Sequence, residues 1–233
     1  MFRPCIVCEE ECDKRLISPY SFLCDDCYKA VMSFKYKTDF ASIDDLPFSY
    51  KKSDGASTRA KVKVKSLFRY EGEARTLLLQ YKMEGNEKAK PFFIDSVKEY
   101  LDANFDKDKT LIIPLPCSRK GFRTRGFDQC IEILKGLDYK WCPGVELLKK
   151  HAKQQKTLSS KDRLISSSGK YGLNEAMLKG VLPRFTNFVL FDDVLTTGAS
   201  LASVLSEFYP FVKGQNKNAS ISALTLFREE PVL

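Results

Sequence analysis

The stretch FVLFDDVLTTGAS, residues 188–200, decides the fold of this chain. Its first four residues are a continuous apolar run, which is typical of a strand in a parallel sheet covered on both faces. Apolar residues between 201 and 208 then have the spacing of an amphipathic helix. The stretch therefore predicts a strand that ends at Phe191, a turn and a helix, which is the repeating unit of an α/β fold.

The turn after this strand has the composition of a phosphate-binding site. Gly198 lets the backbone approach a ligand closely, and the free N–H groups at a helix N-terminus attract an anion. The residues expected to form this cradle are Thr196, Thr197, Gly198, Ala199 and Ser200. The sequence contains no Walker or dinucleotide-binding glycine pattern. The alternative is a strand capped by Asp and followed by an ordinary Thr/Gly turn.

Two carboxylates, Asp192 and Asp193, stand directly before this cradle, where they would repel a phosphate placed beside them. Their position is favourable if they accept hydrogen bonds from neutral hydroxyls or hold Mg²⁺. Open α/β sheets bind ligands at the carboxyl ends of their strands, and these acids are expected there. A ligand with vicinal hydroxyls at one end and a phosphate at the other suits both halves, and ribose 5-phosphate is such a ligand.

A basic segment follows a second apolar run, residues 111–113. Four cations occupy seven positions and are interleaved with Gly121 and Gly126, namely Arg119, Lys120, Arg123 and Arg125. Guanidinium groups bind the oxygens of polyanions, so we expect a mobile loop that meets pyrophosphate or single-stranded nucleic acid. An ordinary solvated basic loop is the alternative.

Apolar periodicity elsewhere alternates strands with helices, which favours a doubly wound α/β fold with a parallel sheet. The expected helices are 28–36, 73–83, 91–101, 129–134 and 201–208. The expected strands are 62–70, 111–113, 188–191 and 220–227. Residues 38–59 are mixed in character and end in the polar run KKSDGASTR, so we expect a connection there.

Four of the eight cysteines form two CxxC pairs near the N-terminus. The pairs are Cys5 with Cys8 and Cys24 with Cys27, and the spacing between them matches a zinc module. Four thiolates close a tetrahedral site with no open position, so the zinc would be structural. Redox CxxC pairs are the alternative. The remaining cysteines are expected to be core or surface thiols: Cys12, Cys117, Cys130 and Cys142.

The composition indicates a soluble globular protein. The 233 residues are 43% hydrophobic and 29% charged, with a net charge of +8. This charge suits phosphate-bearing partners, either nucleotides or nucleic acid, and an ordinary basic surface is the alternative. No apolar run approaches the ~18 residues that cross a bilayer, and the N-terminus lacks the apolar core of a secretory signal. We therefore expect a cytoplasmic protein without membrane insertion.

Several motifs together resemble the ComF family of phosphoribosyltransferase-like proteins associated with DNA uptake in natural transformation. They are the paired CxxC head, YEGEARTLLLQYKMEG at 70–85, IPLPCSRKGFRTRGFDQ at 113–129, QKTLSSKDR at 155–163 and FVLFDDVLTTGAS. The resemblance covers nearly the whole chain. It implies a four-cysteine zinc module over residues 1–37, a connecting segment over 38–61 and a type I phosphoribosyltransferase-like domain over 62–233.

The resemblance also implies a ligand, phosphoribosyl pyrophosphate with Mg²⁺. Asp192 and Asp193 match the carboxylates that bind the ribose hydroxyls, and 196–200 matches the 5-phosphate loop. The pyrophosphate side is matched by Leu115 and Pro116 together with Arg119, Arg123 and Arg125 of the basic segment. Further matched polar positions have no assigned role: Lys82, Gln155 and Arg163.

The chain departs from the family pattern at two places. Asp128 stands where the family usually has Asn and adds negative charge near the presumed pyrophosphate, unless it serves as a helix N-cap. Lys149, Lys150 and His151 stand where an Arg-rich run is expected. Both departures are compatible with the fold of the family, but they argue against catalytic turnover. His151 is the one histidine of the chain, and beside two lysines we expect it on the surface.

Three functions fit these features. The first is a binding protein that holds phosphoribosyl pyrophosphate and engages single-stranded DNA and the DNA-uptake machinery. The second is an enzyme that transfers the phosphoribosyl group to a nitrogenous acceptor with loss of pyrophosphate. The third is a nucleotide-sensing regulator of DNA metabolism. No catalytic residue is assigned from the sequence, because nothing in it marks an acceptor site.

Overall fold

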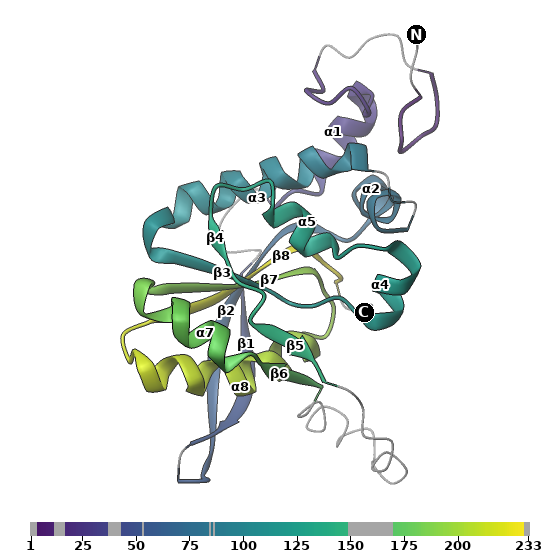
Figure 1. The fold of residues 1–233 in the computed structure, drawn as a ribbon. Helices are drawn as coiled ribbons and strands as arrows, with labels where there is room; N and C mark the ends of the chain where they lie inside the picture. The colour runs from purple at the N-terminus through teal and green to yellow at the C-terminus, as the bar shows by residue number, and fades with distance from the viewer. Residues whose placement is uncertain are drawn as a thin grey trace, which may run out of the picture.

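A six-stranded sheet runs through the middle of the molecule, with strand order β1-β2-β8-β7-β3-β4 (Figure 1). The computed structural model describes residues 4–11, 17–36, 43–52, 54–83, 85, 87–148 and 170–230. The strands are β1 (Ile43–Lys51), β2 (Ser57–Arg69), β8 (Ser220–Arg228), β7 (Asn187–Leu195), β3 (Thr110–Pro114) and β4 (Lys140–Trp141). β1 is antiparallel to β2, and the other neighbours are parallel. A short hairpin, β5 (Val145–Leu147) with β6 (Tyr171–Leu173), forms a second sheet.

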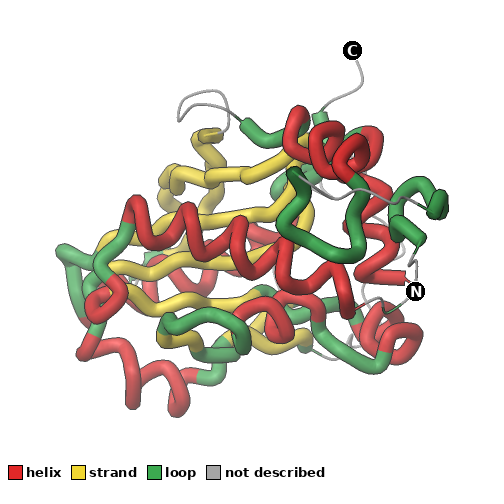
Figure 2. Tube along the Cα trace, turned by 90° about the horizontal axis from the view of Figure 1, so that it is seen from above, coloured by secondary structure: helices red, strands yellow, loops and turns green. Residues whose placement is uncertain are grey.

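Helices cover both faces of the large sheet (Figures 1 and 2). α2 (Gly72–Met83), α3 (Lys90–Asn104) and α5 (Gln129–Leu134) contribute to the core on one face, and α7 (Glu175–Val181) and α8 (Ala199–Gln215) to the core on the other. α1 (Asp25–Ser33) also buries residues in the core of the first face, whereas α4 (Arg119–Arg125) has no buried residue. This arrangement confirms the predicted α/β class with a mostly parallel central sheet.

The apolar run of β7 shows why the sheet is covered on both sides. Val189 and Phe191 are buried in the core under α3, whereas Phe188 and Leu190 are buried in the core with α8. A strand with an exposed face would alternate apolar and polar residues, and this one does not. The helices expected at 73–83, 91–101, 129–134 and 201–208 are all present, and α3 has Pro91 in its first turn.

The connection expected over residues 38–61 is wrong for most of its described part. Residues 43–51 form β1, which pairs along its whole length with the first half of β2. Phe48 of β1 is buried against Tyr209 of α8, with ring centroids 5.2 Å apart. Leu46, Phe48 and Tyr50 alternate with less apolar residues, as in a strand with one buried face, but Pro47 between them argues against a strand unless it lies at a sheet edge. The domain boundaries themselves stay a prediction.

The cysteine-rich head packs on α3. The Tyr20 ring meets the Phe92 ring edge-on at 5.5 Å, and the Tyr20 hydroxyl donates to Asp95 Oδ2 at 2.7 Å. Leu23 of the head is fully buried in the same core as Phe92. α1 begins at Asp25, three residues before the expected position, with the Cys24 sulfur accepting from the Cys27 N–H at its N-terminus. The head therefore shares the core of the sheet rather than hanging free.

None of the helices in the described part of the chain is both long and apolar enough to span a membrane.

Candidate functional site

The candidate site lies where the connections of the sheet change direction. The chain leaving β3 reaches α5 on one face, whereas the chain leaving the neighbouring strand β7 enters α8 on the other face. The carboxyl ends of such a strand pair open a crevice between the diverging chains, and ligands of α/β proteins bind there. Pro114, the last residue of β3, pairs with Phe191, so the rest of β7 has no β3 neighbour.

β7 continues past its expected end. It stays paired with β8 as far as Leu195, opposite Arg228, so Asp192 and Asp193 belong to the strand instead of following it. The sequence suggested an end at Phe191 because charged residues are rarely found in a strand covered on both faces. Here they are tolerated because β3 has already left the sheet on that side.

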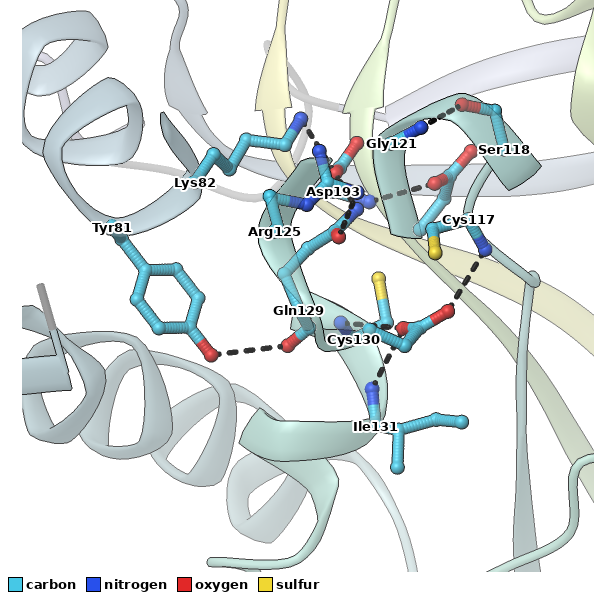
Figure 3. A network of polar contacts seen from close by, with 12 residues as sticks. Tyr81, Lys82, Cys117, Ser118, Gly121, Arg125, Gln129, Cys130, Ile131 and Asp193 are labelled. Carbon is cyan, nitrogen blue, oxygen red and sulfur yellow. Dashed lines mark hydrogen bonds and ion pairs between the residues drawn. The ribbon is translucent and has the colours of Figure 1, made fainter. Parts of the chain in front are cut away.

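Asp193 is buried, with 8% of its surface exposed, and it is bound by two side chains (Figure 3). Its Oδ2 forms an ion pair with the Lys82 ammonium of α2 at 2.6 Å and accepts a hydrogen bond from Gln129 Nε2 of α5. Gln129 in turn accepts from Arg125 Nη2 of α4 through Oε1 at 2.7 Å. Asp193 thus contacts side chains of α2 and α5, with α4 joined through Gln129, and it lies inside the fold, where an accessible carboxylate was expected.

Asp192 is half-buried and accepts the Asp193 backbone N–H at 2.9 Å. Burial, with the negative charge of Asp193 added, raises the pKa of Asp192 to about 8. The Cys130 thiol lies beside both, since the Cys130 sulfur and one oxygen from each aspartate lie within 4.8 Å of one another. Burial also raises the pKa of Cys130 well above its ordinary value. At neutral pH the group therefore contains a protonated carboxyl and a neutral thiol.

The turn at 196–198, where the sequence predicts a phosphate cradle, joins β7 to α8 through a left-handed glycine. Gly198 adopts φ +73° and ψ 2° at the N-terminus of the 17-residue helix α8, a left-handed conformation that favours glycine. Thr196 and Thr197 are exposed, and Thr197 Oγ1 accepts the Ala199 N–H at 3.4 Å. Ser200 is half-exposed in the first turn of the helix. The two threonines of this turn therefore reach the surface, whereas Gly198 itself is buried.

A cleft of about 450 Å³ opens beside this turn. Its lining combines the turn and Leu195 with the start of β1 and the end of β8: Asp44, Asp45, Leu46, Arg228, Glu229 and Glu230. Arg228 forms ion pairs with Asp44 and, at 3.6 Å, with Glu230. The far wall of the cleft is therefore acidic around one guanidinium, which suits hydroxyl groups or a cation better than a second phosphate.

The basic segment is a short helix, so the expectation of a loop is wrong. Ser118 caps α4 by accepting the Gly121 N–H at 3.0 Å, and Gly126 ends the helix with φ 82°. Arg123 is exposed, whereas the exposed Arg119 donates to the Leu147 carbonyl at 3.2 Å. Lys120 is also exposed. The cations thus divide between solvent and structural contacts.

Arg125 turns inward to Gln129, which in turn binds Asp193 (Figure 3). Its Nε is buried and has no hydrogen-bond partner within the described residues. Buried donors are nearly always paired, so this atom calls for an acceptor. Leu115 is buried, with its N–H bonded to the Phe191 carbonyl at 2.8 Å, and Pro116 is half-buried.

Asp128 is the N-cap of α5, which is the second of the two roles that the sequence suggests for it. Its Oδ1 accepts the N–H groups of Cys130 and Ile131 at 3.0 and 3.1 Å, and its Oδ2 accepts the Cys117 N–H at 2.8 Å. Both carboxylate oxygens thus hold backbone N–H groups, which joins the end of the β3 connection to α5. This use of the acid is local to the protein and requires no ligand.

Some predicted residues lie outside the part of the chain that the structure describes, and the structure adds site residues that the sequence did not reveal. Cys12, Lys149, Lys150, His151, Gln155 and Arg163 lie outside the described residues. Lys82 had no assigned role from the sequence, and its partner is Asp193. Gln129 and Arg228 were missed as site residues. Gln129 belongs to one of the matched motifs, but the sequence gives it no role. Arg228 lies near the site only because β8 is the neighbour of β7 in the sheet.

The four cysteines of the head form a cluster that can hold a metal such as zinc. The sulfurs of Cys5, Cys8, Cys24 and Cys27 lie within 4.8 Å of one another, and the Cys8 and Cys24 sulfurs are 3.9 Å apart. Tetrahedral Zn–S bonds of about 2.3 Å would place sulfurs about 3.8 Å apart, so the fit is good. Burial raises the pKa of Cys5, but backbone hydrogen bonds outweigh it and lower that pKa to about 7, whereas burial raises the pKa of Cys8 and of Cys27. Zinc binding would therefore release protons from these thiols.

Comparison with known proteins identifies no family. No family model and no curated protein matches the chain. A solved structure of adenine phosphoribosyltransferase from Leishmania donovani is similar over 91% of this chain and 85% of its own, at 14% identity and a TM-score of 0.32. A likeness at that level carries no argument about this chain's activity or substrate.

Proposed function

We propose that this protein binds phosphoribosyl pyrophosphate with Mg²⁺ at the carboxyl edge of its sheet. The observation that carries the proposal is the unit formed by the end of β7, the left-handed turn at Gly198 and the N-terminus of α8, set at the switch point between β3 and β7. The 5-phosphate would bind the turn, where backbone N–H groups and the helix dipole meet an anion.

The pyrophosphate would bind on the α4 side of the crevice. Arg125 Nε is a buried donor that lacks a partner among the described residues, and an anionic oxygen would satisfy it. Lys82 offers a second cation, since 18% of its side chain is exposed while it pairs with Asp193. The orphan guanidinium nitrogen favours a ligand over a purely structural cluster.

The acids fit Mg²⁺ in part. Magnesium takes oxygen ligands and is commonly held by one or two carboxylates together with substrate phosphates. Asp192 is half-buried and can bind once it loses its proton, whereas Asp193 must first exchange Lys82 for the ion or for a ribose hydroxyl. Ligand binding is therefore expected to rearrange the contacts of Asp193. Bound magnesium would neutralise charge on the pyrophosphate.

The biological role that we propose is in natural transformation, with single-stranded DNA and the DNA-uptake machinery as partners. It is supported by the resemblance of the motifs to the ComF family and by the net charge of +8. The alternative is an active phosphoribosyltransferase that acts on a nitrogenous acceptor. Incubating the protein with phosphoribosyl pyrophosphate, Mg²⁺ and a panel of bases and amines separates the two, because only the enzyme releases pyrophosphate.

Calorimetry with phosphoribosyl pyrophosphate and Mg²⁺ tests the binding site. The double substitution Asp192→Asn and Asp193→Asn is expected to abolish binding, and Asp138→Asn, at the amino edge of the sheet, is expected to leave it unchanged. Because the buried Asp193 also supports the fold, Thr197→Val serves as a second variant at an exposed position, and it is expected to weaken binding about tenfold by removing one phosphate donor. Equal affinity in all four proteins would refute the proposed site.

A further inference from the structure

The hairpin of β1 and β2 carries a row of cations on one face. Arg59, Lys61 and Lys63 alternate along β2 with residues that point the other way, such as Val62, which is buried in the core with α8. Lys51 of β1 lies on the same face, because it pairs with Ser57 and the two-residue period continues from there to Arg59. All four cations are exposed. We call Lys51, Arg59, Lys61 and Lys63 the basic ribbon.

The charge of this face is strongly one-sided. Every residue of β1 and β2 is described, and among those on this face Asp45 is the one carboxylate, opposite Lys63 in the register. Lys61 Nζ lies 3.3 Å from Asp45 Oδ2, with 67% and 56% of the two side chains exposed. Exposed ion pairs are weak and exchange readily with other partners. Four cations against one acid leave a net positive face.

The row ends where α3 begins to cover it. Lys65, the next residue on this face, is 7% exposed and has its Nζ 5.8 Å from the centre of the Tyr100 ring of α3. Figure 1 shows the hairpin running beyond the rest of the sheet on the side of its 52–56 turn. The carboxyl edge with the Gly198 turn lies at the opposite end of β2, at the level of Arg69. Asp45, which pairs with Lys61, also lines the cleft beside that turn, so the two surfaces adjoin at this carboxylate. None of the four cations of the ribbon lines the cleft.

Protection of the sheet edge does not account for this arrangement. Exposed lysines on an edge strand discourage pairing with other chains. The edge strand here is β1, yet three of the four cations are on its inner neighbour β2. A membrane surface is also a poor partner, because interfacial binding needs apolar side chains beside the charges. The exposed large apolar residues of the described chain are Ile17, Met83, Phe122, Leu148 and Met177, all outside the hairpin.

A linear polyanion matches the ribbon in shape. Alternate residues of a strand are about 7 Å apart, which is comparable with the separation of successive phosphates along one nucleic-acid strand. The cations of β2 form a single row, which suits one row of phosphates, and none of the exposed residues of the two strands on this face is aromatic and able to stack on bases. We propose that the basic ribbon binds a single nucleic-acid strand through its phosphates, without reading the base sequence.

This inference rests on the nucleic-acid part of the proposed function and is independent of the phosphoribosyl site. The test compares the full chain with a ribbon variant (Arg59→Gln, Lys61→Gln, Lys63→Gln) and a control variant with the same loss of charge at exposed cations elsewhere (Lys135→Gln, Lys140→Gln, Arg184→Gln). Fluorescence anisotropy follows a labelled oligothymidine from about 50 to 200 mM salt. Circular dichroism and calorimetry with phosphoribosyl pyrophosphate are expected to be alike for all three proteins.

Each cation–phosphate contact on a single strand contributes about 0.7 to the slope of log K against log salt, so the ribbon variant should lose about 2 in slope and about a hundred-fold in affinity at 0.1 M salt. The control variant should keep the slope of the unmodified chain. If the unmodified chain binds but both variants keep its slope, the ribbon is not the surface and the inference fails alone. If the unmodified chain does not bind the oligonucleotide even at low salt, the nucleic-acid part of the proposed function fails with it. Loss of binding to anionic vesicles but not to oligothymidine would reassign the ribbon to membranes.

Discussion

Replacing Gly198 by alanine tests the turn on which the proposed phosphate site depends. The residue has φ +73°, a conformation that costs an L-residue about 1–2 kcal/mol. An added Cβ would also lie 2.5 Å from Leu46 Cδ1, so the leucine side chain must move. Because that atom is the free end of a flexible side chain, the overpacking cost should be at the low end of the range, about 1 kcal/mol. Alanine also gives the unfolded chain less conformational freedom than glycine does, and this offsets about 0.4–1 kcal/mol of the destabilisation.

The expected net loss in the free energy of unfolding is therefore about 2 kcal/mol for Gly198→Ala. Gly55→Ala is the matched control, since Gly55 has φ +83° and open space around the position of a Cβ, and it should cost about 1 kcal/mol or less. Urea denaturation separates the two, because with a slope near 2 kcal/mol/M a difference of 1 kcal/mol moves the midpoint by about 0.5 M.

A second substitution isolates the contact with Leu46. Introducing Leu46→Ala into the Gly198→Ala protein should remove the overpacking, so the cost of Gly198→Ala measured in that background should fall to that of Gly55→Ala. Equal costs for Gly198→Ala and Gly55→Ala in the natural background would show that the turn does not pack against β1 as described.

Three further predictions concern the acids and the metal cluster. Lys82→Met should destabilise the fold by about 3 kcal/mol in urea denaturation, since it leaves the buried Asp193 without its cation. Adding Asp193→Asn should recover part of this loss, and a cost of Lys82→Met below about 0.5 kcal/mol would contradict the ion pair. Asp192 is protonated in the folded state up to about pH 8 and ionised in the unfolded state above about pH 4, so its contribution to the free energy of unfolding falls as pH rises through that window. Asp192→Asn should reduce the loss of stability between pH 5 and 8 by about 2 kcal/mol, after allowing for partial exposure. The same loss in both proteins would count against the raised pKa. Cys24→Ser should remove bound zinc, measured by atomic absorption, and lower the melting temperature, whereas Cys142→Ser should keep the metal; zinc retained by Cys24→Ser would exclude the four-thiolate site.

Local signals account for the parts of the fold that were predicted correctly. The apolar runs that became β3 and β7 are buried on both faces, and the helical spacing at 73–83 became α2 within one residue. The Gly198 turn was also predictable, because few residues other than glycine adopt positive φ there. Each of these depends on residues that are close together in the chain.

Two of the misses depend on partners that are distant in the chain, and one is local. The sequence predicts a connection where β1 forms, because the order of β1 comes from pairing with β2 and packing on α8. The sequence predicts a mobile loop at α4 because of its glycines, whereas Ser118 and Gly126 cap a short helix there, which is the local miss. The burial of Asp193 depends on Lys82 and Gln129.

The sequence by itself determined the α/β class, the glycine turn between β7 and α8 and the two CxxC pairs. Each of these depends on a short stretch of chain, through the side-chain period, the conformational freedom of glycine or the spacing of the ligands. Only the tertiary structure decided which charged side chains are paired or buried and which are exposed to solvent. It places Asp193 in an ion pair, turns Arg125 inward and leaves the cations of the basic ribbon in solvent. The physical reason is that burial and partnership of a charge are set by groups that the sheet and its helices bring together from distant parts of the chain, and no local pattern encodes them.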